Sequence, residues 1–326
     1  MALLTALAAS LAWLGRQGTR AVAVTIFLGL ALPPLAALFK PYLPASIFGL
    51  LCLAFLRVEP AALRAQARRP GLAIAATAWT MLVTPALAGS LFVAFGLSAR
   101  APDLMPALIL QTAGAPLMSA TAFAALLGLD AALTLTIMVL ALAIVPFTAP
   151  VFAQLFLGAA LEVSPILLSI RLLAMLAGAA GLAAAIRWLA GRDWIERHHE
   201  HVDGLNIVML FFFAVTLMDG VVAHTITDPL LVLGLVVLSV ALSLGTGGLT
   251  MLAFLPAGRD RALAIAFAAA QRNMGLMLAA MGGAVPEVAW LYFALAQFPI
   301  YLSPQLLKPL ARRLAPAGRA AGSLKA

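Results

Sequence analysis

Three polar side chains interrupt an otherwise apolar segment in the second half of the chain. The segment RALAIAFAAAQRNMGLMLAAMGG (261–283) contains Gln271, Arg272 and Asn273, and Gly275 follows them. A guanidinium with an amide on each side supplies the donors that bind an organic anion such as a carboxylate. Three consecutive residues of an α-helix point up to about 200° apart, so one face cannot hide them all. The stretch therefore predicts an opened helix with polar groups available to a ligand.

A second stretch, QTAGAPLMSATAF (111–123), combines helix-breaking and polar residues in a similar way. It contains Gly114 and Pro116, followed by Ser119 and Thr121. Proline removes a backbone donor and glycine lets the chain open, so carbonyl and amide groups become available. The structural alternative is an ordinary proline kink whose hydroxyls bond back to their own helix.

The composition places both stretches in a membrane protein. Hydrophobic residues make up 64% of the 326 residues and charged residues only 10%, whereas about a quarter of a soluble domain is charged. The net charge of +8 does not indicate a nucleic-acid partner, because the basic residues lie between apolar runs. The single cysteine, Cys52, excludes a disulfide framework within the chain. We therefore expect a lipid bilayer as the surroundings.

Apolar segments long enough to cross about 30 Å of hydrocarbon occur along the whole chain. We predict ten membrane-spanning helices, at residues 20–39, 43–58, 72–97, 104–127, 131–157, 164–190, 205–225, 229–255, 262–282 and 288–310. Several contain Pro or Gly, as in ALPPLA and VTPALAG, which a bundle interior accommodates. The first residues, MALLTALAASLAWLG, have no basic residue before their apolar centre, so we expect an interfacial helix rather than a signal peptide.

Basic residues are distributed unevenly over the connections between these segments. One alternate set of connections carries sixteen Lys or Arg residues and the other carries two. The positive-inside rule then places both termini in the cytoplasm and supports an even number of spans. The Ala-rich, Arg-rich composition indicates a bacterial inner membrane. The sixteen are Arg16, Arg20, Arg57, Arg64, Arg68, Arg69, Arg187, Arg192, Arg197, Arg259, Arg261, Lys308, Arg312, Arg313, Arg319 and Lys325, and the two are Lys40 and Arg100.

Ten spans divide into two halves of five, and the second half then enters the membrane from the opposite side. This predicts an all-α integral membrane protein with one transporter domain, 1–326, built from inverted repeats at 20–157 and 164–310. In such repeats an interrupted helix from each half meets its counterpart near the midplane, around a binding site. The fourth and ninth segments, which contain the two polar stretches, are the predicted pair.

Arg272 lies near the centre of the ninth segment, about 16 Å along the helix from Arg261. A charge at that depth costs at least about 2.5 kcal/mol, so a partner is expected. Asp219 is the only acid that the sequence brings toward the bilayer interior, and we expect it to pair with Arg171. Three roles therefore remain open for Arg272: binding a ligand, bonding carbonyls freed in the fourth segment, or pairing with Asp219.

The motifs of these two segments resemble those of a known family. GAPLMSATAFAALLGLDAALTLTIMVLALAIVPFTAP (114–150) and FAAAQRNMGLMLA (267–279) resemble the bile acid:sodium symporter family, and more distantly the arsenite carriers of the same fold. The resemblance implies ten helices in a core and a panel domain. It also implies that the fourth and ninth helices unwind and cross, with sodium ions and an organic anion beside the crossing.

Individual residues match the family motifs at both breaks. Asn273 and Gly275 match an N-x-G in the ninth helix, and Ser119 matches a small polar residue in the fourth, although Ala120 replaces the asparagine that typically follows. The resemblance implies possible sodium ligands, which are Ser119, Thr134, Asn273 and Thr80. The predicted substrate-binding residues are Arg272, Gln271, Asn273, Ser119, Thr121 and Thr112.

The ninth segment departs from the family at two positions. Ala268 replaces a glutamate that contacts sodium, and Arg272 replaces the glutamine before the asparagine. At an effective dielectric constant of 20, a fixed positive charge about 4 to 6 Å from sodium costs roughly 3 to 4 kcal/mol. We hypothesise that the guanidinium of Arg272 replaces a sodium ion and contacts a carboxylate substrate. Coupling would then be to protons, with His224 as one candidate carrier, to anion exchange, or absent.

The predicted function is secondary active transport of a small organic anion by alternating access, with sodium coupling reduced or replaced. Two alternatives are a conventional sodium-coupled symporter that keeps one sodium site, and a sensor or scaffold that does not transport. An enzyme is not expected, because motifs such as HExxH and paired intramembrane carboxylates are absent from the sequence. Apart from sodium, no cofactor or metal is predicted, and the His-rich residues 192–203 form a charged cytoplasmic loop.

Overall fold

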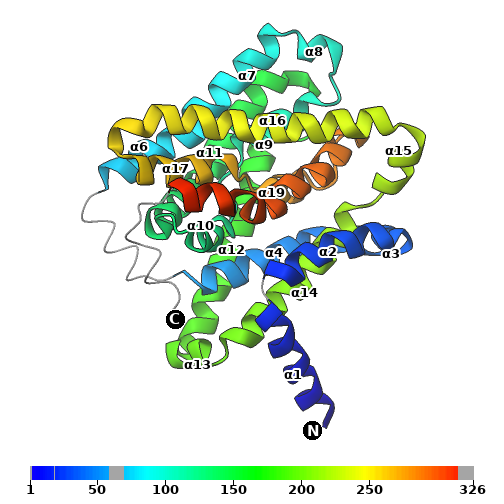
Figure 1. The fold of residues 1–326 in the computed structure, drawn as a ribbon. Helices are drawn as coiled ribbons and strands as arrows, with labels where there is room; N and C mark the ends of the chain where they lie inside the picture. The colour runs from blue at the N-terminus through cyan, green and yellow to red at the C-terminus, as the bar shows by residue number, and fades with distance from the viewer. Residues whose placement is uncertain (1, 18, 59–69, 315–326) are drawn as a thin grey trace.

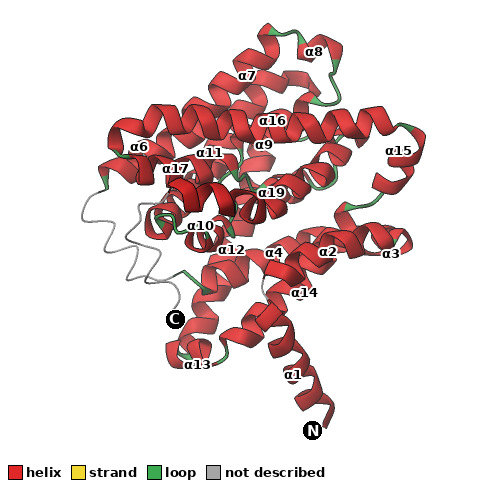
Figure 2. Ribbon diagram, viewed as in Figure 1, coloured by secondary structure: helices red, strands yellow, loops and turns green. Residues whose placement is uncertain are grey.

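The computed structural model describes residues 2–17, 19–58 and 70–314, and this part of the chain is almost entirely helical (Figure 1, Figure 2). Within it no β-strand forms, and a single isolated bridge joins two loops. The helices are α1 (Ala2–Gln17), α2 (Thr19–Ala31), α3 (Pro33–Phe39), α4 (Leu43–Leu56), α6 (Gly71–Ala78), α7 (Thr84–Ala94), α8 (Leu97–Arg100), α9 (Met105–Ala113), α10 (Ala120–Leu126), α11 (Ala131–Leu157), α12 (Pro165–Ala190), α13 (Arg192–Arg197), α14 (His199–Leu217), α15 (Val221–Thr227), α16 (Pro229–Phe254), α17 (Arg259–Ala270), α18 (Met274–Met281) and α19 (Glu287–Leu314).

Six helical runs in the described residues are long and apolar enough to cross a membrane by length and composition. They are Pro33–Leu56, Gly71–Ala94, Ala131–Ala160, Pro165–Ala190, His199–Thr227 and Pro229–Ala257. The chain is therefore an all-α membrane protein, as the composition predicted. Ten crossings and the inverted-repeat arrangement remain predictions. In particular, the first run joins α3 to α4, whereas the sequence predicted separate spans at 20–39 and 43–58.

Local signals explain where the long helices begin and end. The side chain of Asp130 caps α11 by accepting a hydrogen bond from the backbone N–H of Leu133 at 3.0 Å. Ser164 and Asp228 cap α12 and α16 in the same way, and a proline follows each of them at the first helical position. Oxygen-bearing caps satisfy backbone donors that have no partner in the first turn. The boundaries predicted at 131–157 and 229–255 therefore agree closely with α11 and α16.

The helices form two groups that are packed together (Figure 1). In one group, α14 packs against α2, α3 and α4, and α12 packs against α4. In the other, α11 packs against α9, α10 and α17, while α16 packs against α17 and α19. The interrupted segments α9–α10 and α17–α18 belong to the second group, and α18 also contacts α4 and α12.

Two arginines outside the polar stretches donate hydrogen bonds to carbonyl oxygens at the C-terminal ends of other helices. Arg171 donates from Nη1 to the carbonyl oxygens of Ala280 and Met281, at 3.2 and 3.1 Å, at the end of α18. Arg187 donates from Nη2 to the carbonyl of Val58 at 2.9 Å, just beyond α4. The last carbonyls of a helix lack partners and carry partial negative charge, so a guanidinium stabilises them.

The predicted pairing of Asp219 is wrong. Its carboxylate lies 2.8 Å from Nζ of Lys40, and that ammonium also lies 4.6 Å from the centre of the Trp290 ring. Arg171 does not pair with Asp219, because its Nη1 donates to the carbonyls of α18. Asp219 and Arg171 lie on the same predicted side of the membrane. The guanidinium nevertheless bonds the last carbonyls of α18, which lack partners within their own helix.

The N-terminal residues form α1, which packs against α14. Gly15 and Gly204 lie at this contact, where a Cβ on either glycine would come within 2.0 Å of a backbone oxygen of the other helix. The contact also holds an ion pair between Arg16 and Glu200, with 2.8 Å between Nη1 and Oε2. An interfacial position for α1 remains a prediction, but one of its faces is fixed by the body of the protein.

Some basic residues used to predict the orientation lie outside the described residues, so the orientation itself remains a prediction. They are Arg64, Arg68, Arg69, Arg319 and Lys325. The His-rich loop 192–203 contributes α13 and the start of α14. Its side chains interact locally, as where the rings of Trp194 and His198 stack with centroids 4.3 Å apart. In the described residues, no three His, Cys, Asp or Glu side chains are grouped as metal ligands would be.

Candidate functional site

Both predicted interruptions are present, and they meet. The first separates α9 from α10 at residues 114–119, and the second separates α17 from α18 at 271–273. The backbone N–H of Leu117 donates to the carbonyl of Gln271, and the N–H of Asn273 donates to that of Ala115, each at 2.8 Å. These bonds flank an antiparallel bridge between Pro116 and Arg272. The opened segments therefore cross and satisfy part of each other's backbone. We call this contact the crossing.

The sequence at each break explains why the helices open there. Pro116 has no N–H to continue the helix, and Gly114 takes an extended conformation with φ −65° and ψ 151°. In the second break Gln271 is also extended, with φ −94° and ψ 100°. Asn273 then starts α18 as its N-cap, with its side-chain oxygen accepting from the N–H of Leu276 at 3.0 Å. Asparagine is among the best residues for this position.

Removal of this cap should weaken the second half of the broken helix. We expect Asn273→Ala to lower the free energy of unfolding by about 1 kcal/mol, the usual cost of losing an N-cap. Thermal unfolding of the purified protein, followed by tryptophan fluorescence, measures the change. Asn273→Ser or Asn273→Asp keeps a capping oxygen and should lose much less. Equal loss in all three variants would mean that the cap contributes nothing specific.

Arg272 is 3% exposed and lies at the crossing. Its Nη1 donates to the carbonyl oxygen of Gly114 at 2.9 Å and to that of Thr80 at 3.1 Å. Thr80 lies in a π-helical turn, Trp79–Val83, between α6 and α7, and such turns redirect backbone carbonyls. The guanidinium thus joins the third predicted span to both interrupted segments.

No carboxylate of the described residues lies within 4 Å of this guanidinium, so a pair with Asp219 is not formed. Its Nε and Nη2 are buried and have no hydrogen-bond partner among the described residues. Its charge is balanced by carbonyl dipoles, including one at the C-terminal end of α9. Of the three roles left open by the sequence, bonding to freed carbonyls is the one favoured by this geometry.

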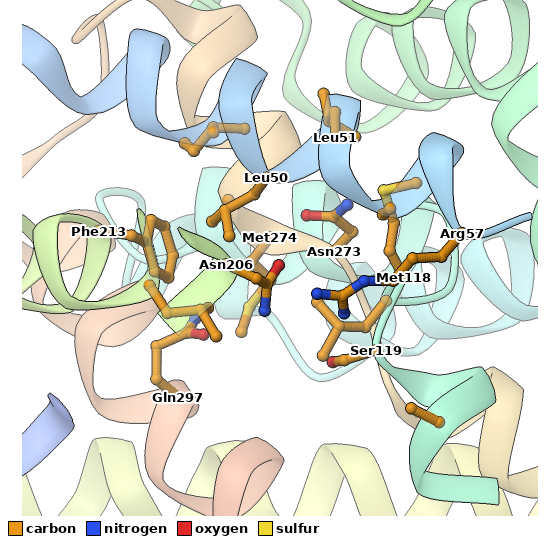
Figure 3. Close-up of a pocket in the computed structure, with 16 residues that line it drawn as sticks. Leu50, Leu51, Arg57, Met118, Ser119, Asn206, Phe213, Asn273, Met274 and Gln297 are labelled. Atoms are coloured by element: carbon orange, nitrogen blue, oxygen red, sulfur yellow. The ribbon is translucent and has the colours of Figure 1, made fainter. Parts of the chain in front are cut away.

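A cavity of about 130 Å³ lies beside the crossing, between α4 and α14 on one side and α18 and α19 on the other (Figure 3). Its wall is mostly apolar and includes Leu50, Phe213 and Met274. The polar side chains that line it are Arg57, Ser119, Asn206, Asn273 and Gln297. An apolar wall with a few convergent polar groups is typical of a site for a small organic molecule.

The cavity brings together only some of the predicted site residues. Ser119 and Asn273 line it. Arg272 and Gln271 are buried in the crossing and are not part of the lining. A contact between Arg272 and a substrate therefore remains a prediction that would require a rearrangement of the crossing.

Two of the predicted hydroxyls bond back to their own helix, and two do not. Thr112 donates to the carbonyls of Leu108 and Ile109, and Thr134 donates to that of Asp130 at 2.9 Å. The hydroxyl of Thr121 lies 3.9 Å from the sulfur of Met138, and that of Thr80 is buried without a partner among the described residues. For Thr112, in the fourth segment, this is the arrangement expected from the alternative of hydroxyls bonded back to the helix.

Three lining residues were missed by the sequence analysis. Arg57 was counted as a charge of a cytoplasmic connection, yet it follows α4 directly and reaches the cavity. Asn206 and Gln297 lie within apolar helices α14 and α19. For Asn206 and Gln297 the sequence signal is an isolated amide in an otherwise apolar helix.

His224, the candidate proton carrier, lies away from this cavity. Its Nε2 is 3.0 Å from Oε1 of Glu287, at the start of α19. The imidazole is partly buried, while the carboxylate is largely exposed. This contact joins α15 to α19, so a structural role accounts for the histidine.

Comparison with known proteins adds no family assignment. No protein-family model matches the chain. A search of curated proteins likewise finds no match. The class of protein therefore rests on the fold and the site: an all-α membrane protein in which two interrupted helices cross beside a cavity. The resemblance to bile acid:sodium symporters rests on the motifs at these two breaks.

Proposed function

We propose that this protein is a secondary active transporter of a small organic anion, similar to the bile acid:sodium symporters. The observation that carries the proposal is the crossing of two interrupted helices beside the cavity. Irregular backbone at membrane depth is tolerated where it lines a cavity or is buried in protein. In transporters built from inverted repeats, such helices form the substrate site near the midplane.

The packing of the helices also supports alternating access. The cavity lies between the group that contains α4 and α14 and the group that contains the crossing. A rocking movement of one group against the other would open the site to each side in turn. In this proposal the two groups correspond to the panel and the core of the symporter fold. The repeats 20–157 and 164–310 then contribute one broken helix each.

The position of Arg272 supports transport without a sodium ion at the crossing. Sodium takes oxygen ligands, and the guanidinium already occupies two carbonyl oxygens there, those of Thr80 and Gly114. A fixed charge so placed would hold the broken helices in position permanently. We therefore propose that Arg272 replaces a bound cation and that transport does not need a sodium ion at the crossing. The proposed location is a bacterial inner membrane, with both termini in the cytoplasm.

A two-stage experiment tests this function. Thermal unfolding of the purified protein is measured against a panel of organic anions, each as the sodium and as the potassium salt. Anions that stabilise the protein are then assayed for counterflow in proteoliposomes. Saturable counterflow that is equal in sodium and potassium is expected. Stabilisation without flux would indicate a sensor, flux without saturation a channel, and a requirement for sodium a conventional symporter.

A further inference from the structure

Among the residues that the structure describes, Arg57 is the only basic side chain that lines the cavity beside the crossing, and its guanidinium extends into the space near Asn206 and Ser119 (Figure 3). It comes from the end of α4, while Asn206 belongs to α14 and Ser119 to the first interruption. Three separate elements therefore bring polar groups to one end of a cavity whose remaining wall is largely apolar. This arrangement differs from the site predicted around Arg272.

Only some of the hydrogen-bond donors of the Arg57 guanidinium have a partner among the described residues. Its Nη2 lies 2.7 Å from Oδ1 of Asp203 and 3.3 Å from the carbonyl oxygen of Val202, both on α14. No other described residue accepts a hydrogen bond from its Nε or Nη1. A guanidinium has five donors in a planar fork, so one edge remains available to a second carboxylate. Asp203 therefore orients the Arg57 side chain through Nη2 and leaves its other donors for a ligand.

The neighbouring polar groups complete an anion site. The side-chain oxygen of Asn273 is committed to the N–H of Leu276, so its amide nitrogen is left as a donor at the cavity. The hydroxyl of Ser119 and the amide of Asn206 are further donors. Donors from several directions around a cation suit a carboxylate better than a neutral ligand.

The volume of the cavity limits the size of the ligand. About 130 Å³ is close to the roughly 150 Å³ of an apolar protein cavity that binds benzene, a molecule with about six non-hydrogen atoms. A short aliphatic or keto acid fits this space, with its chain against Leu50 and Phe213. A sterol carboxylate is several times larger and does not fit.

We propose that Arg57 binds the carboxylate of a short-chain monocarboxylic acid in this cavity. The inference rests on the proposed transport function and names its substrate class and its anion-binding residue. Arg272 then holds the crossing together, and Arg57 recognises the ligand. Asp203 orients Arg57 but also repels an incoming anion, so it sets an upper limit on affinity.

Titration calorimetry on the purified full-length protein tests this proposal. The probes are butyrate, hexanoate, decanoate and cholate, with butyramide as the uncharged counterpart of butyrate. The variants are Arg57→Gln, Arg57→Lys and Asp203→Asn. Arg16→Gln is the matched control, because it also removes an arginine paired with an acid on α14 but lies outside the cavity.

We expect wild type to bind butyrate or hexanoate more tightly than decanoate, and cholate and butyramide not at all. Arg57→Gln should weaken binding by at least about tenfold, as expected for a lost charge-assisted hydrogen bond. Arg57→Lys should bind with intermediate affinity, because it keeps the charge without the fork. Asp203→Asn should bind more tightly, and Arg16→Gln should match wild type.

The outcomes separate this inference from the proposed function. If wild type binds an acid and Arg57→Gln binds it within twofold as well, the role of Arg57 is wrong while transport stands. If cholate binds better than the short acids, the assigned substrate class is wrong. If Arg57→Gln fails to fold, unchanged or weaker binding by Asp203→Asn overturns the assignment. If wild type binds none of the acids and shows no counterflow with any anion, the transport function fails too.

Discussion

Replacement of Arg272 by glutamine is expected to destabilise the protein strongly in potassium and to make its stability depend on sodium. The variant loses the donor to the carbonyls of Gly114 and Thr80, which are held at the crossing. A buried polar group left without a partner costs about 1 to 3 kcal/mol, so two of them cost several kcal/mol. Thermal unfolding in potassium chloride should therefore show a midpoint well below that of wild type.

Sodium should restore part of this loss. The variant leaves two backbone carbonyls and the new amide oxygen around the space of the guanidinium, and hard cations prefer oxygen ligands. We expect sodium chloride to raise the midpoint of Arg272→Gln above that in potassium chloride of equal concentration. Wild type should show no such difference, because its guanidinium already occupies these carbonyls.

Arg171→Gln is the matched control for this experiment. It also removes a guanidinium that bonds two carbonyls, those of Ala280 and Met281, but it lies at the end of α18. It should be destabilised without any preference for sodium. The idea that Arg272 replaces a cation fails if sodium and potassium act equally on Arg272→Gln. A variant that keeps wild-type stability but no longer binds an acid would instead support the direct substrate contact predicted from the sequence.

The helical segments and the two breaks could be predicted because their signals are local. The length of each apolar run, and caps such as Asp130, depend on residues within one helix. The breaks were equally readable: Pro116 cannot continue a helix, and three consecutive polar residues at 271–273 cannot share one face. The expectation that the two breaks meet came from the predicted ten spans, which would place them at equivalent positions in two halves, and the meeting itself is observed.

Side-chain partners could not be predicted in this way, because they depend on elements far apart in the chain. Arg272 reaches Thr80, which is 192 positions away, because a π-helical turn presents that carbonyl. Asp219 pairs with Lys40, 179 positions away, and not with the arginine that hydropathy placed on the same side. Arg57 was assigned to a solvated loop because a basic residue at the end of a span usually lies in one. Its side chain is indeed 40% exposed, but only the folded chain shows that it also lines the cavity.

Gly204→Ala is expected to displace α1 from α14 and also to weaken ligand binding in the cavity. A Cβ at Gly204 would lie 1.9 Å from the backbone oxygen of Leu11, and one at Gly15 would lie 2.0 Å from that of Glu200. Close backbone contact through small residues is a common way for membrane helices to pack. Because the obstructing atoms belong to the backbone, a rotamer change cannot relieve the overlap, and the helices must separate.

Two effects with opposite signs determine the result. Alanine improves helix propensity over glycine by about 1 kcal/mol, whereas overpacking typically costs about 1 to 3 kcal/mol and sometimes more. An overlap with backbone belongs at the upper end of that range, so the net change at Gly204 should be destabilising. Gly181 on α12 has nothing within 4 Å of its missing Cβ, so Gly181→Ala should instead be neutral or stabilising. The midpoint of thermal unfolding should therefore fall for Gly204→Ala and stay unchanged or rise for Gly181→Ala.

The same substitution links the N-terminal helix to the ligand. Gly204 lies between Asp203, which pairs with Arg57, and Asn206, which lines the cavity. A displacement of α14 at this point should alter both contacts, so Gly204→Ala should also weaken butyrate binding in the calorimetric assay. Gly15→Ala should have a similar effect, because it separates the same two helices from the other side. Stability and binding unchanged in both variants would mean that α1 does not pack closely on α14 in the native protein.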